Sequence, residues 1–268
     1  MPTESSGIVG VKKFSLHSFA TNIIEIKASI PILVTKPVMH LFYQPDIPAG
    51  TLHLDVEESR HAVKVMRLKS GDSIKLTDGN GHFYTANITE ANHKKCAFEI
   101  TSKEEVKAHS TFRHLAIAPT KNLDRTEWFI EKAVELGVDR ISFLLGDHSE
   151  RKVLKLERIV KKAIGAMKQS GQAFMPQIDE LTSIKNFISQ AKANHKFIAY
   201  VDFENEALLK EKLVGSASNL VMIGPEGDFS EREVVMAMEA GYIKVSLGTN
   251  RLRTETAGLA AVHLMNLA

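Results

Sequence analysis

Two glycine-centred segments near the carboxyl end of the 268-residue chain carry its strongest chemical signal. They are Val221-Met-Ile-Gly-Pro-Glu-Gly-Asp-Phe-Ser230 and Ser246-Leu-Gly-Thr-Asn-Arg-Leu-Arg-Thr-Glu-Thr-Ala257. Each follows a short apolar run and precedes a helical pattern, which is typical of loops at the ligand-binding end of an α/β sheet. Neither has the glycine spacing of a phosphate-binding loop or of a dinucleotide-binding turn. We therefore expect the loops to bind something other than a pyrophosphate.

The first loop, Gly224-Pro-Glu-Gly227, has two glycines whose backbone can approach a ligand closely. Ser230 and Glu233 have the spacing of a capping box, so part of the segment is an ordinary helix start. Capping does not explain Glu226, which stands in the turn itself. We expect a ligand-binding loop and leave open whether Glu226 takes part in the chemistry or only shapes the turn.

The second loop repeats this arrangement one strand later, because Leu247-Gly248 is followed by Arg251, Arg253 and Glu255. Guanidinium groups stay charged and donate hydrogen bonds in a planar fork, which suits a phosphate or a developing anion. The alternative is a surface pair of arginine and glutamate, which contributes little to stability. The neighbouring glycine loop favours a functional role.

A cluster of basic side chains lies much earlier in the chain. On a helix or an extended segment several of them could face one line of phosphates, which would make this region an RNA-binding surface. The alternative is a solvated basic face without a partner. The members are Arg60, His61, Lys64, Arg67 and Lys69, and three further residues could extend the surface: Lys121, Arg125 and Arg151.

Other candidate residues give weaker signals. Trp128 and Phe129-Ile130 fall on the apolar face of a helical pattern and are predicted to be core residues. Lys132 and Glu135 are either a pair on the helix surface or part of a site with Gln169-Ser170. The histidines have no metal-ligand spacing, so we predict no metal site.

The chain changes its periodicity near position 111. From Met39 to about Ser110 it is β-rich, with a hairpin over 73–89 around Asp78-Gly-Asn-Gly81, a strand within 94–101 and a polar linker at 102–110. After Thr111 strands and helices alternate, which predicts a mainly parallel sheet covered on both faces. The predicted strands are 112–118, 141–145, 197–201, 220–223 and 243–247, and the predicted helices are 125–136, 154–168, 182–194, 230–240 and 255–267.

The composition is that of a globular protein, with 44% hydrophobic and 25% charged residues. The net charge of +2 is too small to indicate nucleic acid by itself. The single cysteine, Cys96, excludes a disulfide framework and fits a cytoplasmic protein. No apolar run is long enough for a transmembrane helix. Residues 1–38 are expected to be a loosely ordered extension or to precede a true start at Met39.

Five segments, in order along the chain, resemble those of the RsmE family of ribosomal RNA methyltransferases, which are SPOUT-class enzymes. The resemblance runs from about Met39 to Ala268, with two departures: Asp228 replaces a glycine, and Asn250-Arg251 stands where arginine followed by an apolar residue is commoner. The segments are His61-Ala-Val-Lys-Val-Met-Arg67, Glu131-Lys-Ala-Val-Glu-Leu-Gly-Val138, Gln169-Ser-Gly171, Ile223-Gly-Pro-Glu-Gly-Asp-Phe-Ser230 and Leu247-Gly-Thr-Asn-Arg-Leu-Arg-Thr-Glu-Thr-Ala257.

The resemblance implies a PUA-like β-barrel RNA-binding domain at 39–108 and an α/β SPOUT methyltransferase domain at 111–268, whose parallel sheet ends in a trefoil knot. It implies a cytoplasmic homodimer that methylates N3 of a uridine in 16S rRNA, free or in the small ribosomal subunit, with S-adenosylmethionine as methyl donor. No membrane partner is expected. The cofactor-binding residues would be Ile223, Gly224, Pro225, Glu226, Gly227, Leu247, Gly248, Leu252 and Arg253.

Methylation at N3 of uracil requires loss of the N3 proton and stabilisation of charge on the carbonyl oxygens. Arg253 is the candidate for that electrostatic role, and Glu226, Glu255 or water is the candidate proton acceptor. The target uridine must be unpaired or flipped out, because pairing hides N3. One competing hypothesis is a catalytically silent RNA-binding factor for ribosome assembly. Another, a nucleotide-dependent α/β enzyme, is disfavoured by the missing phosphate motif.

Overall fold

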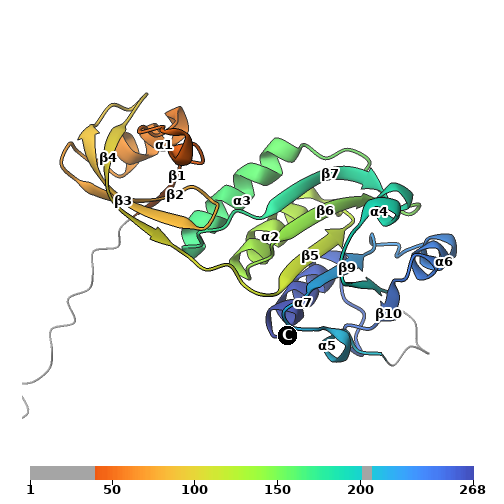
Figure 1. The fold of residues 1–268 in the computed structure, drawn as a ribbon. Coiled ribbons are helices and arrows are strands. Elements are labelled where there is room, and N and C mark those ends of the chain that lie inside the picture. Colours follow the sequence, from red (N-terminus) through yellow and green to blue (C-terminus); the bar gives the residue numbers. More distant parts are fainter. Residues whose placement is uncertain (1–39, 201–206) are drawn as a thin grey trace, which may run out of the picture. The chain divides into compact units, whose positions relative to one another are not determined.

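The structure is a computed structural model that describes residues 40–200 and 207–268 (Figure 1). Within these ranges the chain forms a smaller β region followed by a larger α/β region. The expected amino-terminal extension, residues 1–38, and the expected start at Met39 lie outside the described residues.

The β region is built on a four-stranded sheet in the order β1-β2-β3-β4. β1 runs parallel to β2, and the other two pairs are antiparallel. The expected hairpin is confirmed, because β2 pairs with β3 around the Asp78-Gly-Asn-Gly81 turn. The elements are β1 Leu41–Tyr43, the 3-10 helix η2 Ile47–Ala49, α1 Val56–Arg60, the π-helix η3 His61–Val65, β2 Ser73–Thr77, β3 His82–Glu90 and β4 Ala97–Glu105.

The last strand of this sheet is longer than expected. β4 continues to Glu105, which pairs with His82, so the predicted linker at 102–110 is wrong in its first four residues. The side chains of 102–105 are all exposed. A strand end that is exposed on both faces has no alternation of polar and apolar residues, and its sequence therefore resembles a loop.

The β region has its own apolar core. Its side chains come from the strands and from the segment that carries α1, and each fully buried one contributes about 1.5–3 kcal/mol to folding. The largest of them are Phe42, Leu54, Ile74, Leu76 and Ile88.

The α/β region contains a six-stranded sheet in the order β10-β8-β9-β5-β6-β7, in which every neighbouring pair is parallel. This confirms the α/β class. The strands are β5 Phe112–Ile117, β6 Arg140–Leu145, β7 Gln177–Ser183, β8 His195–Ala199, β9 Ser218–Ile223 and β10 Ile243–Val245. The helices are α2 Leu123–Glu135, α3 Leu156–Ser170, α4 Ile184–Gln190, α5 Leu209–Lys212, α6 Glu231–Glu239 and α7 Thr254–Asn266. The trefoil knot stays a prediction.

Two elements of this region were not predicted. β7 is an edge strand whose residues, Gln177 to Ser183, are only partly buried or exposed, so they lack an apolar run. The predicted helix at 182–194 starts instead at Ile184, where Ser183 accepts a hydrogen bond from the Asn186 backbone as N-cap. The other missed element, α5, is only four residues long.

Helices cover both faces of the sheet (Figure 1). Successive residues of β5 point to opposite faces: Ile117 packs in the cluster that contains residues of α2, α3 and α7, whereas Ala116 packs in the cluster of α4 and α6. The prediction that Trp128 lies in the core is wrong, because its side chain is 47% exposed. Its neighbours Phe129 and Ile130 occupy the core face of α2, as predicted.

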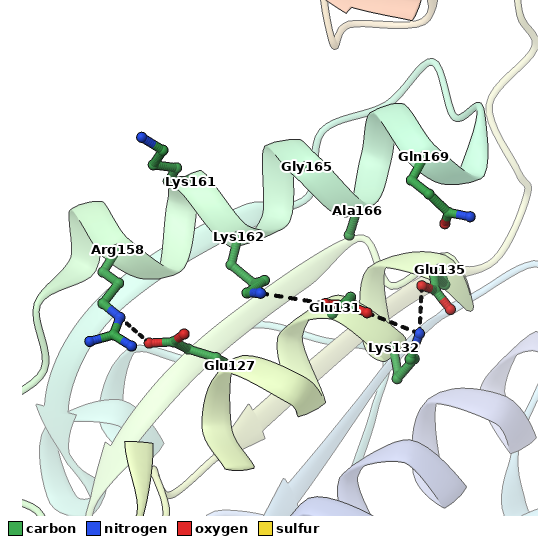
Figure 2. Close-up of a pocket in the computed structure, with 10 residues that line it drawn as sticks. All are labelled: Glu127, Glu131, Lys132, Glu135, Arg158, Lys161, Lys162, Gly165, Ala166 and Gln169. Carbon is green, nitrogen blue, oxygen red and sulfur yellow. Dashed lines mark hydrogen bonds and ion pairs between the residues drawn. The ribbon is translucent and has the colours of Figure 1, made fainter. Parts of the chain in front are cut away.

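Helices α2 and α3 lie side by side and are linked by charged side chains (Figure 2). Arg158 on α3 pairs with Glu127 on α2, and Lys162 pairs with Glu131 at 3.5 Å. Between the helices is a groove of about 660 Å³.

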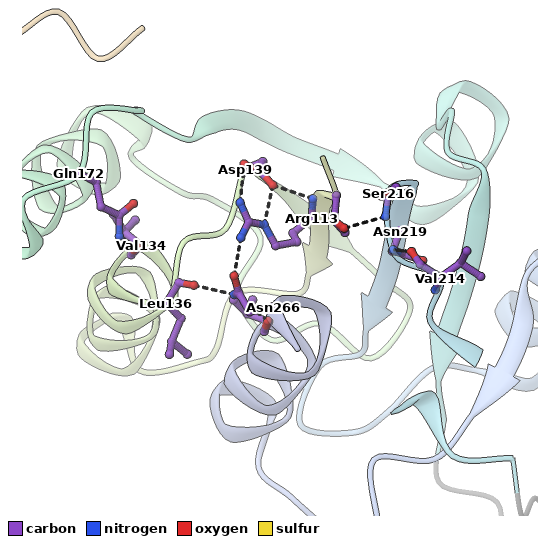
Figure 3. A network of polar contacts seen from close by, with 11 residues as sticks. Arg113, Val134, Leu136, Asp139, Gln172, Val214, Ser216, Asn219 and Asn266 are labelled. Carbon is purple, nitrogen blue, oxygen red and sulfur yellow. Dashed lines mark hydrogen bonds and ion pairs between the residues drawn. The ribbon is translucent and has the colours of Figure 1, made fainter. Parts of the chain in front are cut away.

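A buried network anchors the end of α7 (Figure 3). Arg113, at the start of β5, is 5% exposed, and its guanidinium donates to both carboxylate oxygens of Asp139 and to the side-chain oxygen of Asn266. The amide nitrogen of Asn266 in turn donates to the carbonyl of Leu136, just after α2. The end of α7 is thus fixed to the amino-terminal end of β5, whereas the glycine loops follow the carboxyl ends of their strands.

Candidate active site

Four loops leave the carboxyl ends of parallel strands, and the border of the sheet that these strand ends form is called the sheet edge below. They follow β5, β6, β9 and β10 and span 118–122, 146–155, 224–230 and 246–253. In open α/β sheets this is the edge where ligands bind. The two glycine-centred loops of the sequence are therefore placed on the same edge.

Loop 118–122 contacts the loops on either side of it. Oε1 of Glu226 accepts a hydrogen bond from the backbone N–H of Lys121, with 2.9 Å between the atoms. The guanidinium of Arg151 donates to the carbonyl oxygen of Thr120 at 2.9 Å and also to that of Lys121. The loops after β5, β6 and β9 are therefore joined by side chains that bond backbone groups. For Arg151 this is a structural role that the sequence did not indicate.

The glycine loop after β9 is closely packed beneath its surface. A Cβ on Gly224 would lie 3.1 Å from the ring of Phe229, which is 3% exposed, and a Cβ on Gly227 would lie 3.0 Å from Cβ of His148. Nδ1 of His148 lies 3.1 Å from the carbonyl oxygens of Gly227 and Asp228. These glycines are required by the internal packing of the loop, whatever ligand it binds.

Asp228 has a left-handed backbone, with φ of 62°. Glycine adopts this conformation without strain, and aspartate is among the few other residues that tolerate it. The Asp228 carboxylate also accepts a hydrogen bond from the backbone N–H of Phe229 at 2.8 Å. The departure from the family's glycine is therefore accommodated by the backbone of the loop.

The predicted capping box is confirmed. Ser230 caps α6, and the carboxylate of Glu233 accepts a hydrogen bond from the Ser230 backbone at 2.8 Å. The other Glu233 oxygen accepts from the backbone N–H of Asp147 at 2.9 Å, which ties α6 to the loop after β6. Hydrogen bonding from Ser230 and the nearby charge of Arg232 lower the pKa of Asp147.

The loop after β10 is held at its start and open further on. The backbone N–H of Ser246 donates to Ala207 at 2.8 Å, and the Ser246 carbonyl accepts from Leu209 at 2.9 Å. Two residues later, Gly248 is exposed and has φ of 135°. A Cβ there would meet no atom within 4 Å. The N–H and the carbonyl of Gly248 both bond the hydroxyl of Ser246, at 3.2 and 2.9 Å, so a ligand would reach this backbone by displacing that hydroxyl.

Arg253 occupies the position just before α7. Its backbone is extended, and it is the N-cap residue of the helix without a capping side-chain bond. Arg251 and Arg253 are both exposed. Within the described ranges of the chain, neither guanidinium has an ion-pair partner. Arg253 is therefore available to an anion at the amino-terminal end of α7, where the helix dipole favours negative charge.

Glu255 lies in the first turn of α7 and is 6% exposed. One carboxylate oxygen is 3.7 Å from a guanidinium nitrogen of Arg125, and the other has no hydrogen-bond partner among the described residues. Its buried side chain lines a narrow space together with Thr120 and Thr126. Glu255 is therefore a nearly buried carboxylate whose charge faces Arg125 of α2.

The predicted cofactor-binding residues divide by accessibility. The two glycine loops follow β9 and β10, which flank β8, so strand spacing separates their starts by about 10 Å. Ile223, Gly224 and Pro225 are buried, Leu247 and Leu252 are half-buried, and Glu226, Gly227, Gly248 and Arg253 are exposed. The exposed backbone and apolar side chains of this edge suit a ligand with polar and apolar parts, such as a nucleoside with a sulfonium side chain.

The basic cluster lies on α1, on the π-helix and just after it. Arg60, Lys64, Arg67 and Lys69 are exposed, as an RNA-binding surface requires. His61 is half-buried instead, because its ring packs edge-on against Phe42 with 6.2 Å between centroids. Of the three residues that could extend the cluster, Lys121 pairs with Glu150 at 2.7 Å, Arg125 faces Glu255, and Arg151 bonds the loop carbonyls.

Lys132 and Glu135 form a surface ion pair, with 2.8 Å between Nζ and Oε1 (Figure 2). This pair raises the pKa of the Lys132 ammonium, and Glu131 adds to the effect. Gln169 lines the same groove between α2 and α3. The ion pair and Gln169 thus line the same groove, at the carboxyl-terminal ends of α2 and α3.

Sequence reasoning missed two residues of the sheet edge. His148 bonds the carbonyls of the first glycine loop, and Asp147 bonds Ser230 and Arg232. Both directly follow the strand β6, and that position was the available signal.

Two general features complete the description of the site. In the ranges that the structure covers, no helix is both long and apolar enough to cross a bilayer. The same ranges contain no group of three or more histidine, cysteine, aspartate or glutamate side chains arranged to hold a metal ion.

Comparison with known families identifies both regions. Residues 108–266 match the RNA methyltransferase domain family, and residues 54–101 match the RNA methyltransferase PUA domain family. The ribosomal RNA small subunit methyltransferase E of Rickettsia conorii is 28% identical over 215 residues, which cover 77% of this chain and 86% of the relative. The protein of the same name from Aquifex aeolicus is 27% identical and covers 85% of this chain and 99% of the relative.

Solved structures agree with this assignment. A probable rRNA-methyltransferase from Porphyromonas gingivalis is 42% identical with a TM-score of 0.78, covering 84% of this chain and 95% of that one. The ribosomal RNA small subunit methyltransferase E of Neisseria gonorrhoeae, solved with S-adenosyl methionine bound, is 28% identical with a TM-score of 0.76, covering 85% and 97%. The RsmE resemblance seen in the sequence is confirmed, and the chain belongs to the RNA methyltransferase family.

Proposed function

We propose that this protein transfers a methyl group from S-adenosylmethionine to N3 of a uridine in 16S rRNA of the small ribosomal subunit. The observation that carries the proposal is the placement of both glycine loops on one sheet edge, with the first fixed to Lys121 through Glu226. The related protein from Neisseria gonorrhoeae, which binds S-adenosyl methionine, supports the choice of methyl donor. The names of the curated relatives support the choice of RNA.

The cofactor is assigned to the two glycine loops, and when bound it supplies an electrophilic methyl group. The exposed backbone of Gly227 and Gly248 would hydrogen-bond its polar parts, and Leu247 and Leu252 would contact its apolar parts. The buried stretch Ile223-Gly-Pro225 would contribute through its backbone and through the shape of the turn.

Arg253 is assigned to the uracil. It is exposed and stands at the amino-terminal end of α7, so its positive charge adds to the positive end of the helix dipole. Placed near the carbonyl oxygens of the base, it would favour the uridinate form and offset the charge of the deprotonated ring. Aligning the N3 nitrogen with the methyl group would supply most of the remaining rate enhancement.

We assign the proton to solvent water rather than to a carboxylate. Glu226 already accepts a hydrogen bond from Lys121, and Glu255 is buried beside Arg125. Glu226 thus positions a loop and Glu255 is held beside Arg125, whereas a general base must reach the proton that it removes. With Arg253 stabilising the anion, the N3 proton can leave to water before methyl transfer.

The RNA contacts are assigned to the exposed basic cluster on and after α1, together with Lys121 at the sheet edge. The proposed domains are a PUA-like RNA-binding domain at 39–108 and a SPOUT methyltransferase domain with its knot at 111–268, after an extension at 1–38. The target uridine must be unpaired or flipped out to expose N3. We place this activity in the cytoplasm.

The active form is proposed to be a homodimer. Trp128 supports this, because a tryptophan that is 47% exposed on α2 is the kind of side chain that subunit interfaces bury. Sedimentation of the wild-type protein and of the variant Trp128→Glu tests the proposal. A dimer that dissociates in the variant is expected, and a monomeric wild-type protein would contradict it.

The function is tested by mass mapping of small-subunit rRNA from cells with and without the protein, followed by methylation of the unmodified subunit by the purified protein. The expected result is a single uridine that gains one methyl group at N3. Calorimetry with S-adenosylmethionine separates the competing hypothesis. A folded protein that binds rRNA but not the methyl donor would instead be a catalytically silent assembly factor.

A further inference from the structure

Helix α3 connects the two places where RNA is expected to bind. Its amino-terminal end follows the loop after β6, at the sheet edge that carries the glycine loops. Further along, Lys161 pairs with Glu57 and Lys168 pairs with Glu58, both on α1. The helix has 15 residues and is therefore about 22 Å long. It spans the distance between the basic cluster of α1 and the proposed methyl-transfer site.

Four exposed basic residues lie along this length of α3 and just before it, beside one exposed acidic residue, Glu157. Lys155, Arg158 and Lys161 follow one another at intervals of three residues, on neighbouring turns, and all three are exposed. The side chain of Arg158 turns into the groove toward α2, whereas that of Lys161 points away from it (Figure 2). Lys152 is exposed in the loop just before the helix. We call these four residues the α3 track.

The track continues onto α1. Nζ of Lys161 lies 2.7 Å from a carboxylate oxygen of Glu57, and Arg60 stands one helical turn after Glu57. The α3 track and the exposed basic residues of α1 therefore lie next to each other. The ion pair of Lys161 and Glu57 joins α3 directly to α1.

The ion pairs on the track leave it able to bind phosphate. Lys161 and Glu57 are 69% and 68% exposed, so water and salt screen their pair and Lys161 can exchange Glu57 for a phosphate. Arg158 points into the groove, where it pairs with Glu127 and lies 3.9 Å from a carboxylate oxygen of Asp124, so it is the least available member of the track (Figure 2). Lys152 and Lys155 form no ion pair within the described part of the chain.

We propose that the α3 track binds the sugar-phosphate backbone of rRNA and leads it from α1 to the methyl-transfer edge. This rests on the proposed function and extends it with a second RNA-binding element that lies outside the β region. Phosphate contacts position an RNA without reading its sequence. The track would thus fix how far along the RNA strand the target uridine lies from the segment that is bound at α1.

The test compares RNA binding by the wild-type protein, the variant Lys155→Gln/Lys161→Gln and the control variant Lys185→Gln/Lys192→Gln. The control removes the same charge from exposed lysines on and after α4, which covers the opposite face of the sheet. The probe is the unmodified small ribosomal subunit, titrated over a range of salt concentrations. Calorimetry with S-adenosylmethionine and thermal unfolding accompany each measurement.

The track variant should bind the subunit about tenfold more weakly at moderate salt. Its plot of log affinity against log salt should be less steep, with a slope smaller in magnitude by about 1.4, the value for two lost phosphate contacts of a single strand. Cofactor affinity, melting temperature and the control variant should be unchanged. Equal affinity and slope for the track variant and the wild-type protein would overturn the proposal. Failure of the wild-type protein to bind or methylate the subunit would instead count against the proposed function.

Discussion

The carboxylate of Glu226 accepts a hydrogen bond from the backbone of Lys121, 105 residues earlier in the chain, at 2.9 Å. The geometry makes Glu226 a connector between two loops of the sheet edge. We therefore predict that Glu226→Gln, which keeps an acceptor oxygen, retains near-normal cofactor affinity and rate. Glu226→Ala should weaken S-adenosylmethionine binding about five- to tenfold, the effect of losing one hydrogen bond of about 1–1.4 kcal/mol at this exposed position. Calorimetry and single-turnover methylation measure the two effects.

The same pair of variants distinguishes a connector from a general base. A base is lost as completely in Glu226→Gln as in Glu226→Ala, and the pH dependence of the rate changes with it. A rate loss of a hundredfold or more in Glu226→Gln, with cofactor binding intact, would return Glu226 to the chemistry.

Arg253 should act on the transition state. We predict that Arg253→Ala lowers the single-turnover rate by about 10²–10³, the usual cost of losing one donor to a developing anion. Cofactor affinity should change only a few-fold. Arg251→Ala is the matched control, because Arg251 is equally exposed and only two residues away. Near-normal turnover in Arg253→Ala with cofactor bound would refute the assignment.

Asp228 gives a prediction about stability. Asp228→Ala keeps the Cβ in a left-handed conformation, with φ of 62°, but removes the polar side chain that lets aspartate tolerate it. It should lower the free energy of unfolding by about 1–3 kcal/mol, from backbone strain and the lost bond to Phe229. Asp228→Asn, which tolerates this backbone and keeps an acceptor, should stay close to the wild-type protein in denaturant titrations. Equal stability of the two variants would exclude the backbone explanation.

The sequence allowed the parallel sheet and both glycine loops to be predicted, because apolar strands followed by glycine turns are local signals. It did not allow the contact between Glu226 and Lys121 to be predicted, since that contact depends on β5 and β9 being neighbours in the sheet. Trp128 was misplaced for a related reason. Helical periodicity defines an apolar face, but the packing of Phe129 and Ile130 decides where that face ends.

His114 should make stability depend on pH. It is 3% exposed, and its Nε2 lies 2.8 Å from Oγ of Ser142. Burial, assisted by the charge of Arg140 and opposed by Asp179, lowers the pKa of His114 to about 4, from 6.5. The unfolded chain therefore binds a proton between these values that the native protein does not, and stability falls as the pH drops from about 6.5 to about 4.

We predict a loss of about 2 kcal/mol in the free energy of unfolding between pH 7 and pH 5 from this group. The variant His114→Gln should lose this dependence while keeping a polar contact to Ser142. Asp179 faces the same cluster, but its pKa is lowered from 3.8, so its contribution is lost only at lower pH. A His114→Gln variant with unchanged pH dependence would assign the effect to other groups.

The pair of Lys168 on α3 and Glu58 on α1 should hold the β region against the α/β region. The two side chains are only 21% and 10% exposed. Lys168 pairs with Oε1 of Glu58, and the buried Oε2 has no hydrogen-bond partner among the described residues. Lys168→Met leaves this carboxylate buried and unpaired, and should lower the free energy of unfolding by about 2–4 kcal/mol. Lys161→Met, at the exposed pair with Glu57, should cost less than about 1 kcal/mol.

Exchange of the charges in Glu58→Lys/Lys168→Glu tests whether the pair itself is responsible. Recovery of at least half of the stability lost in Lys168→Glu is expected, because attraction between the two positions is restored while their solvent exposure stays the same. Breaking the pair should raise the KM for the ribosomal subunit, since α1 carries the exposed Arg60. The exchanged variant should have a KM between those of the broken variant and the wild-type protein. Without any recovery in the exchanged variant, packing of the Lys168 side chain would be the stabilising contribution instead.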